Sequence, residues 1–324
     1  MVLTFRTLLC KKARFIRLVY YLLDILDILD MKILSRLLNN CRKPDRQIGM
    51  ELGISGGAVG SRINKMEKLG IIEKFCLKVE PPLLGLNMFY IVVNSQNQKE
   101  IIKNVKLAGM PFAIVPCVGG ITVIGVIVKE DMQQKIEVLQ KLMEDVRVMS
   151  VFEADNTKIT HNLTRTDLEI LNQLIQDPRK RIEQLSKDTE LSTKTINRGL
   201  EKLQNNESIQ FTLIYDPSKI EGFLCYAVVA VTQEDIPKML KKFEDEFGED
   251  YLMTPFLAKN QVVLFLYSES IFKMDEMTER VAKVDGTITT ELFIPKKIDM
   301  PEKWLEKRLE TLTKSETLHL SQVN

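Results

Sequence analysis

The sequence is poor in the residues on which most enzymes and metal sites depend. Only two histidines occur, His161 and His319, and the five cysteines are scattered without any C-x-x-C pair. No serine, histidine and carboxylate set and no phosphate-binding glycine motif stands at a recognisable spacing. These absences argue against a zinc site, a disulfide framework and nucleophilic catalysis. We therefore expect a cytoplasmic protein that is not an enzyme and has no metal or cofactor.

Long apolar runs are also missing. The longest uninterrupted one in residues 1–23, Leu18–Leu23, is far below the roughly 20 residues that span a bilayer. Basic side chains interrupt this segment, which the apolar core of a signal peptide would not allow. We expect no membrane span, and an extra helix in residues 1–23. A basic amphipathic helix on a membrane surface, or a translation start assigned too far upstream, would account for the same residues.

The small net charge of +1 hides an uneven distribution. Residues 1–75 carry 14 basic and 7 acidic side chains, a net charge of +7, whereas residues 216–324 carry 14 and 20, a net charge of −6. A basic segment attracts polyanions and holds phosphates, although a solvated surface has the same composition. Charge alone leaves these two interpretations open.

An internal repeat appears when the chain is aligned with itself at an offset of 137 residues. Identical residues then recur in one ungapped register that extends over more than fifty residues, and apolar positions match in kind. The matches include Asp30 with Asp167, Leu34 with Leu171, Leu37 with Leu174, Arg42 with Arg179, Lys43 with Lys180, Ser55 with Ser192, Lys65 with Lys202 and Gly85 with Gly222. The chain is therefore predicted to be a duplication of one unit of about 137 residues.

Each unit begins with the pattern of three short helices. In the first, an apolar stripe over 33–38 precedes a break at Pro44, a short helix over 46–52, and a glycine, Gly53, suited to a helix end. Ser55 then suits the N-cap of a third helix, because its hydroxyl can accept a free backbone N–H. The second unit repeats the pattern, with Ser192 as the cap. This is the pattern of a helix-turn-helix.

The third helix of each unit is predicted to lie in the major groove of double-stranded DNA, because arginine, lysine and asparagine on its polar face can read bases or hold phosphates. A packing module with a solvated face is the alternative, which two similarly capped copies disfavour. The candidate DNA-binding residues are Ser55, Ser61, Arg62, Lys65 and Lys68 in the first unit, and Ser192, Thr193, Lys194, Thr195, Asn197, Arg198 and Lys202 in the second.

These residues resemble the Lrp/AsnC, or feast/famine, family of prokaryotic and archaeal regulators. Residues 29–75, LDMKILSRLLNNCRKPDRQIGMELGISGGAVGSRINKMEKLGIIEKF, show the family's opening aspartate, its "LGIS" turn and its "LGII" end of the recognition helix. Residues 166–231 are similar but looser. The resemblance covers about residues 24–295. It implies that a small-molecule-sensing and dimerising domain follows each helix-turn-helix.

The chain is predicted to be α+β, with two tandem units, each a winged helix-turn-helix followed by a ferredoxin-like βαββαβ domain. After each helix-turn-helix the apolar pattern turns strand-like, and Gly119-Gly120 suits a hairpin. Residues 300–313 read as a further helix. The predicted parts are 1–23, an extra N-terminal helix; 24–76, helix-turn-helix 1; 77–156, ferredoxin-like domain 1; 157–212, helix-turn-helix 2; 213–298, ferredoxin-like domain 2; and 299–324, a C-terminal helix and tail.

Both sensing domains depart from the family pattern. Members usually carry a Gly-x-x-Asp turn between the second and third strands, near the effector pocket. This chain has Gly119-Gly120-Ile121-Thr122 in the first unit and Ala258-Lys259-Asn260-Gln261 in the second, so the aspartate is missing from both. The candidates for an effector pocket are Gly119, Gly120, Thr122, Lys259 and Asn260.

Other functions remain open from the sequence alone. Sirohaem decarboxylases resemble Lrp/AsnC proteins and work as pairs of such subunits, so a fused pair could be an enzyme. A protein–protein adaptor that has lost DNA binding is a further alternative. The preferred prediction is a DNA-binding regulator whose two sheets pair face to face within one chain. A small-molecule effector and a homodimer are additional partners that the family resemblance leaves open.

Overall fold

The structure is a computed structural model that describes residues 25–129, 131–153 and 163–321. The predicted extra helix over 1–23 lies outside the described residues. In the first unit, helices α2 (Ile28–Asn39), α3 (Asp45–Leu52) and α4 (Gly56–Lys68) precede strand β1 (Ile72–Val79). A ferredoxin-like order then follows: β2 (Asn87–Asn94), α5 (Gln98–Ala108), β3 (Met110–Pro116), β4 (Ile121–Val128), α6 (Met132–Leu142) and β5 (Arg147–Phe152).

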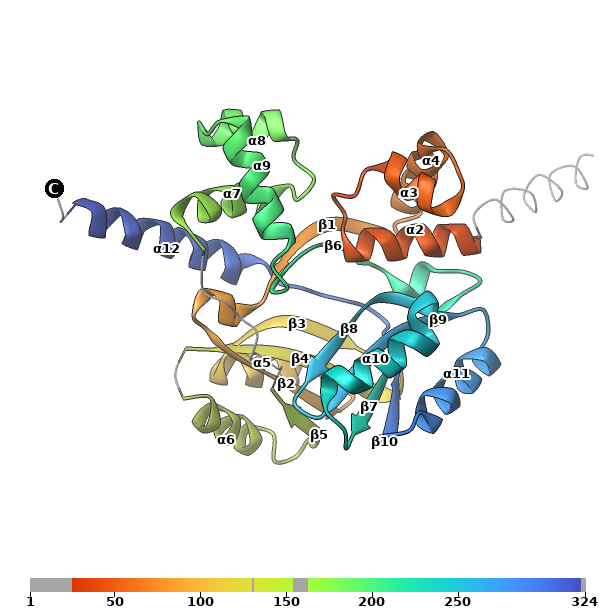
Figure 1. Cartoon of the computed structure of the whole chain (residues 1–324). Helices are drawn as coiled ribbons and strands as arrows, with labels where there is room; N and C mark the ends of the chain where they lie inside the picture. The colour runs from red at the N-terminus through yellow and green to blue at the C-terminus, as the bar shows by residue number, and fades with distance from the viewer. Residues whose placement is uncertain (1–24, 130, 154–162, 322–324) are drawn as a thin grey trace, which may run out of the picture.

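The second unit repeats this order, which confirms the predicted α+β fold (Figure 1). Its helix-turn-helix comprises α7 (Arg165–Gln176), α8 (Ile182–Thr189) and α9 (Thr193–Gln204), followed by β6 (Ile209–Tyr215). Its sheet domain comprises β7 (Leu224–Thr232), α10 (Ile236–Phe247), β8 (Tyr251–Ala258), β9 (Gln261–Ser268), α11 (Ile271–Lys283) and β10 (Thr287–Phe293). The exact domain boundaries proposed from the sequence stay predictions.

Local chemistry explains where the helix-turn-helix elements begin and end. The hydroxyl of Ser55 accepts a hydrogen bond from the Ala58 N–H at 3.1 Å, and Ser192 does the same for Thr195. Gly53 closes α3 with φ of 70°, in the left-handed region that glycine tolerates. Its repeat equivalent, Glu190, takes φ of 57° and is the one described non-glycine residue with a positive φ. The turn geometry therefore persists in the second unit without the residue that favours it.

Strands β1 and β6 pair with each other as an antiparallel two-stranded ribbon. Each strand follows the third helix of its own unit and leads into its own sheet domain. In this register Leu77 lies opposite Phe211, and both side chains are buried. An isolated two-stranded ribbon is marginally stable, so the surrounding helices must cover it. The ribbon thus joins the two units at their centre.

The two sheets have equivalent strand orders, β3-β4-β2-β5 and β10-β7-β9-β8. Helices α5 and α6 cover one face of the first sheet, as α10 and α11 do for the second. The other faces meet, because one apolar cluster combines Val92 with Phe293 and Val229. The ring of Tyr90 also lies 5.1 Å from that of Phe256, edge to face. The chain therefore forms inside itself the sheet-on-sheet contact expected of a dimer.

Each helix-turn-helix packs against the sheet domain of the other unit (Figure 1). Helix α2 lies on β8, where the Ser35 hydroxyl donates to the Tyr251 carbonyl at 3.1 Å and the Thr254 N–H donates to Asn39 Oδ1 at 2.9 Å. The core of the second helix-turn-helix is continuous with Leu84 and Met88 of the first unit. Each unit therefore supports the helix-turn-helix of the other.

The end of the chain returns to the first unit. After β10 it runs beside the edge of β3, where the Ile114 N–H donates to the Asp299 carbonyl at 2.8 Å and the Asp299 N–H donates back at 3.0 Å. Helix α12 (Lys303–Ser321) then packs on α7, with Trp304, Leu305 and Leu309 buried. The predicted C-terminal helix is therefore confirmed. It begins three residues later than expected and extends beyond residue 313.

Among the helices that the structure describes, none combines the length and the apolar character needed to cross a bilayer.

Shortening a buried side chain of α12 should destabilise the second helix-turn-helix. Leu309 is fully buried, and a Leu→Ala change at such a site costs about 2–5 kcal/mol. We expect Leu309→Ala to lower the midpoint of thermal unfolding and to speed amide hydrogen exchange in α7. Thr311→Ala, at an exposed position two residues along the same helix, is the control. Equal protection of α7 in both variants would show that α12 does not support this domain.

Candidate nucleic-acid interface

The two third helices, α4 and α9, lie in the domains that occupy the same side of the molecule, on either side of the β1–β6 ribbon (Figure 1). Their apolar residues face inward: Val59, Ile63 and Met66 are buried in α4, and Ile196, Leu200 and Leu203 in α9. What remains exposed on each helix is the surface available to a ligand.

Helix α9 presents a dense polar surface. Five predicted residues at its start and along its outer face are exposed: Ser192, Thr193, Lys194, Asn197 and Arg198. Thr195 is half-buried, and its hydroxyl shares a hydrogen bond with that of Ser192 at 2.9 Å. Arginine and asparagine can each make paired hydrogen bonds to a base edge. This helix therefore has the groups needed to read sequence.

Helix α4 presents fewer such groups. Ser55, Ser61 and Lys68 are exposed, and so is Asn64, which the sequence interpretation missed. Arg62 and Lys65 are turned back onto α2: Arg62 Nη1 lies 2.7 Å from Asp30 Oδ1 and 2.8 Å from Asp27 Oδ1, and Lys65 Nζ donates to the Ile25 carbonyl at 2.9 Å. The charges of these two residues are therefore engaged inside the domain. Their contact with DNA stays a prediction.

A buried aspartate anchors each third helix to the first helix of its domain. Asp30 is fully buried and lies 3.4 Å from Lys65 Nζ. In the second unit Lys202 donates to Asp167, which also accepts from the N–H and the hydroxyl of Thr164, each at 2.8 Å. The repeat matches Asp30 with Asp167 and Lys65 with Lys202, so the two units share this ion pair. Lys202 is therefore also engaged within the protein.

The ion pairs perturb one neighbouring carboxyl. Partial burial opposes ionisation of Asp27, but hydrogen bonds from the Asp30 backbone and the Arg62 guanidinium outweigh it and hold the pKa of Asp27 below its usual value. The carboxylate therefore stays charged at neutral pH and keeps Arg62 in place.

Two glycines of α4 are explained by packing against α3. A Cβ at Gly56 would lie 3.0 Å from the Arg46 Cα, and one at Gly60 would lie 3.0 Å from Asp45 Oδ2. Gly57 is different, because it is exposed and a Cβ there would meet little. Packing within the domain therefore does not require a glycine at position 57.

The predicted effector residues do not share one environment. Gly119 and Gly120 form the turn between β3 and β4 with φ of 78° and 80°, whereas Thr122 is buried in β4. Lys259 and Asn260 are exposed in the β8–β9 turn. The two turns are equivalent, since Gly120 accepts a backbone hydrogen bond from Ser95 and Asn260 accepts one from Thr232. An effector pocket at these residues stays a prediction.

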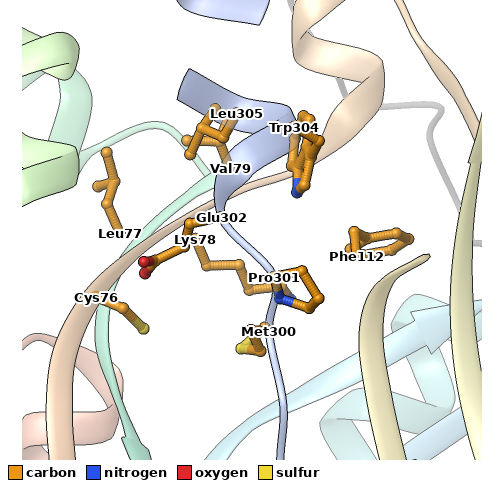
Figure 2. A pocket seen from close by; sticks show the side chains of 10 residues that line it. All are labelled: Cys76, Leu77, Lys78, Val79, Phe112, Met300, Pro301, Glu302, Trp304 and Leu305. Carbon is orange, nitrogen blue, oxygen red and sulfur yellow. The ribbon is translucent and has the colours of Figure 1, made fainter. Parts of the chain in front are cut away.

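A small pocket lies elsewhere, where the start of α12 crosses β1 (Figure 2). Its lining is mainly apolar, with Phe112 and Trp304 on one side and Cys76 on the other. Glu302 is paired with Lys74 at 2.6 Å. Among the described residues no three His, Cys, Asp or Glu side chains are grouped so as to hold a metal ion. This pocket belongs to the seam that joins α12 to the ribbon.

Both helix-turn-helix segments match known domain families. Residues 26–67 match the AsnC-type helix-turn-helix domain, and residues 163–210 match a winged helix-turn-helix DNA-binding domain. The resemblance to the Lrp/AsnC family is confirmed.

The Lrp/AsnC-type relatives come from archaea and bacteria. The regulator Ptr1 of Methanocaldococcus jannaschii is 43% identical over 67 residues, which are 21% of this chain and 45% of that protein. LrpB of Bacillus subtilis is 31% identical over 81 residues, which are 24% of this chain and 54% of that protein. The chain thus spans about half the length of the curated relatives that it matches.

Solved structures resemble the chain more distantly. The siroheme decarboxylase NirDL covers 90% of this chain and 99% of its own, with 14% identity and a TM-score of 0.47. The match to the AsnC protein of E. coli covers 41% of this chain and 91% of that protein, with 20% identity and a TM-score of 0.28. At this distance the likenesses carry no information on activity.

The two lysines of α9 should differ in what they support. Lys202 compensates the buried carboxylate of Asp167, and leaving such a group without its partner costs about 1–3 kcal/mol. We expect Lys202→Ala to lower the midpoint of urea unfolding. Lys194→Ala, at an exposed position, should leave it within error. Equal midpoints for the two variants would contradict the anchoring role of Lys202.

Proposed function

We propose that this chain is a sequence-specific DNA-binding transcription regulator of the Lrp/AsnC type, a cytoplasmic protein that is pseudo-dimeric within one chain and is not an enzyme. The observation that supports this most strongly is the exposed face of α9. Thr193, Lys194, Asn197 and Arg198 project from an N-capped helix in a domain that matches a DNA-binding family. Such a helix suits the major groove in length and chemistry.

The two third helices would contribute differently. Helix α9 carries Lys194, Asn197 and Arg198 where the equivalent positions of α4 are Gly57, Gly60 and Ser61. We infer that α9 reads bases, and that α4 holds the backbone through its exposed N-terminus, Ser61 and Lys68. Phosphate contacts position a protein on DNA, whereas base contacts specify the sequence. One half-site should therefore be more specific than the other.

Replacing Arg198 should weaken binding to the selected operator. We expect Arg198→Ala to cost about 1–3 kcal/mol if the guanidinium contacts a base, measured by fluorescence anisotropy on fragments chosen from genomic DNA. Arg62→Ala removes the arginine of α4, and it should affect mainly stability, since Arg62 is held by Asp27 and Asp30. Unchanged affinity in Arg198→Ala would overturn the assignment of α9 as the helix that reads bases. Tetrapyrrole absorption in the purified protein would instead favour the sirohaem-decarboxylase alternative.

The operator should be asymmetric. Two different readers in one chain need no palindrome, whereas a symmetric dimer requires one. We expect footprinting to show one strongly sequence-dependent half-site and one that tolerates base changes, with the affinity for the tolerant half falling steeply as salt rises. A perfectly two-fold footprint occupied by two chains, each using a single helix-turn-helix, would contradict this expectation.

A further inference from the structure

Two arginines connect the helix-turn-helix domains directly. Arg42 follows α2 and Arg179 follows α7, and they are equivalent in the 137-residue repeat. Arg42 Nη1 donates to the carbonyls of Pro178 and Lys180, at 2.6 and 3.0 Å. In the opposite direction, Arg179 Nη2 lies 3.5 Å from Asp45 Oδ1. Each arginine therefore reaches across to the other unit.

Each guanidinium also lies over an aromatic ring of the central ribbon. The Arg179 guanidinium carbon is 4.6 Å from the centroid of Phe75 on β1, and that of Arg42 is 5.8 Å from the centroid of Phe211 on β6. Both side chains are half-buried. A planar guanidinium can stack on a ring and donate in its own plane at the same time, which a lysine ammonium cannot do. The ribbon thus holds both arginines in position.

The residues that the two arginines contact also contact other helices of the helix-turn-helix domains. Asp45, the partner of Arg179, begins α3, and its other carboxylate oxygen lies 3.0 Å from the place of a Cβ on Gly60 in α4. On the other side, Lys180 contributes the carbonyl that Arg42 binds, and its ammonium donates to Asp188 of α8 at 2.7 Å. A displacement of one domain would therefore strain contacts made by the other.

We propose that Arg42 and Arg179 set the separation and orientation of α4 and α9, and thereby the spacing between half-sites that the protein tolerates. This proposal rests on the proposed function. One base pair inserted between half-sites rotates them by about 35°, because B-DNA repeats every 10–10.5 base pairs. A rigidly held pair of helices cannot follow that rotation. The two arginines would therefore determine specificity without touching a base.

The test compares the wild-type chain with an Arg42→Lys and Arg179→Lys double variant on operators with zero to five base pairs inserted between the half-sites. For the wild type, affinity should fall about fivefold or more with five added base pairs. In the double variant this loss should shrink, while the dependence of affinity on salt stays unchanged because the charges are kept. The control is Arg46→Lys with Arg181→Lys, at exposed positions in the same regions, and it should behave as the wild type.

A measurement without DNA separates this proposal from the proposed function. Spin labels at the exposed Lys68 and Gln204 report the distance between the ends of α4 and α9 in the free protein. The distance distribution should be narrow in the wild type and broad in the double variant. An equally narrow distribution, or an unchanged spacing penalty, would overturn the role of the arginines. Failure of the wild type to select any DNA, with the distances behaving as expected, would overturn the proposed function and its consequence for spacing, but not the coupling.

Discussion

The pairing of β1 with β6 is the constraint on which the arrangement of this molecule depends. Each strand connects a helix-turn-helix to a sheet domain, so pairing the two strands brings both units to one centre. A bare two-stranded ribbon would be marginal, and here helices α2 and α7 cover it from the opposite units. Each helix-turn-helix then rests on the other unit's sheet domain, and the apolar cores around the helix-turn-helix domains contain residues of both units. The two copies of the duplication therefore share the cores of their helix-turn-helix domains.

The buried aspartates show how one interaction can serve stability and constrain function. Asp30 and Asp167 each join the first helix of a domain to the third, through Lys65 and Lys202. Burying a carboxylate is unfavourable unless it is paired and hydrogen-bonded, and both aspartates meet this condition through a capping box and a lysine. The third helix is thereby fixed in orientation. The same pairing withdraws cationic side chains from the surface offered to DNA.

The two copies differ on the exposed faces of their third helices, where a ligand would meet them. Their buried aspartate–lysine pairs match, yet Gly60 and Ser61 of α4 stand where α9 has Asn197 and Arg198. Gly60 also makes room for Asp45, which receives Arg179 from the second unit. Helix α4 thus contributes to the contact between the two units at Gly60, where α9 carries the polar side chain of Asn197. The difference between α4 and α9 and the contact between the two helix-turn-helix domains therefore involve the same residues.

The sequence by itself determined the local elements, because caps such as Ser55 and Ser192, breaks such as Pro44 and the apolar periods act over a few residues. It also determined the duplication and the order of strands. It could assign Arg62, Lys65 and Lys202 only to the polar side of a helix, since their aspartate partners lie 35 residues or so away in the chain. The tertiary structure alone decided three further features. Each helix-turn-helix packs on the other unit, α12 packs on α7, and Arg42 and Arg179 contact the opposite helix-turn-helix domain. Helical and strand periodicity specify which face a residue occupies, whereas tertiary packing decides what that face meets.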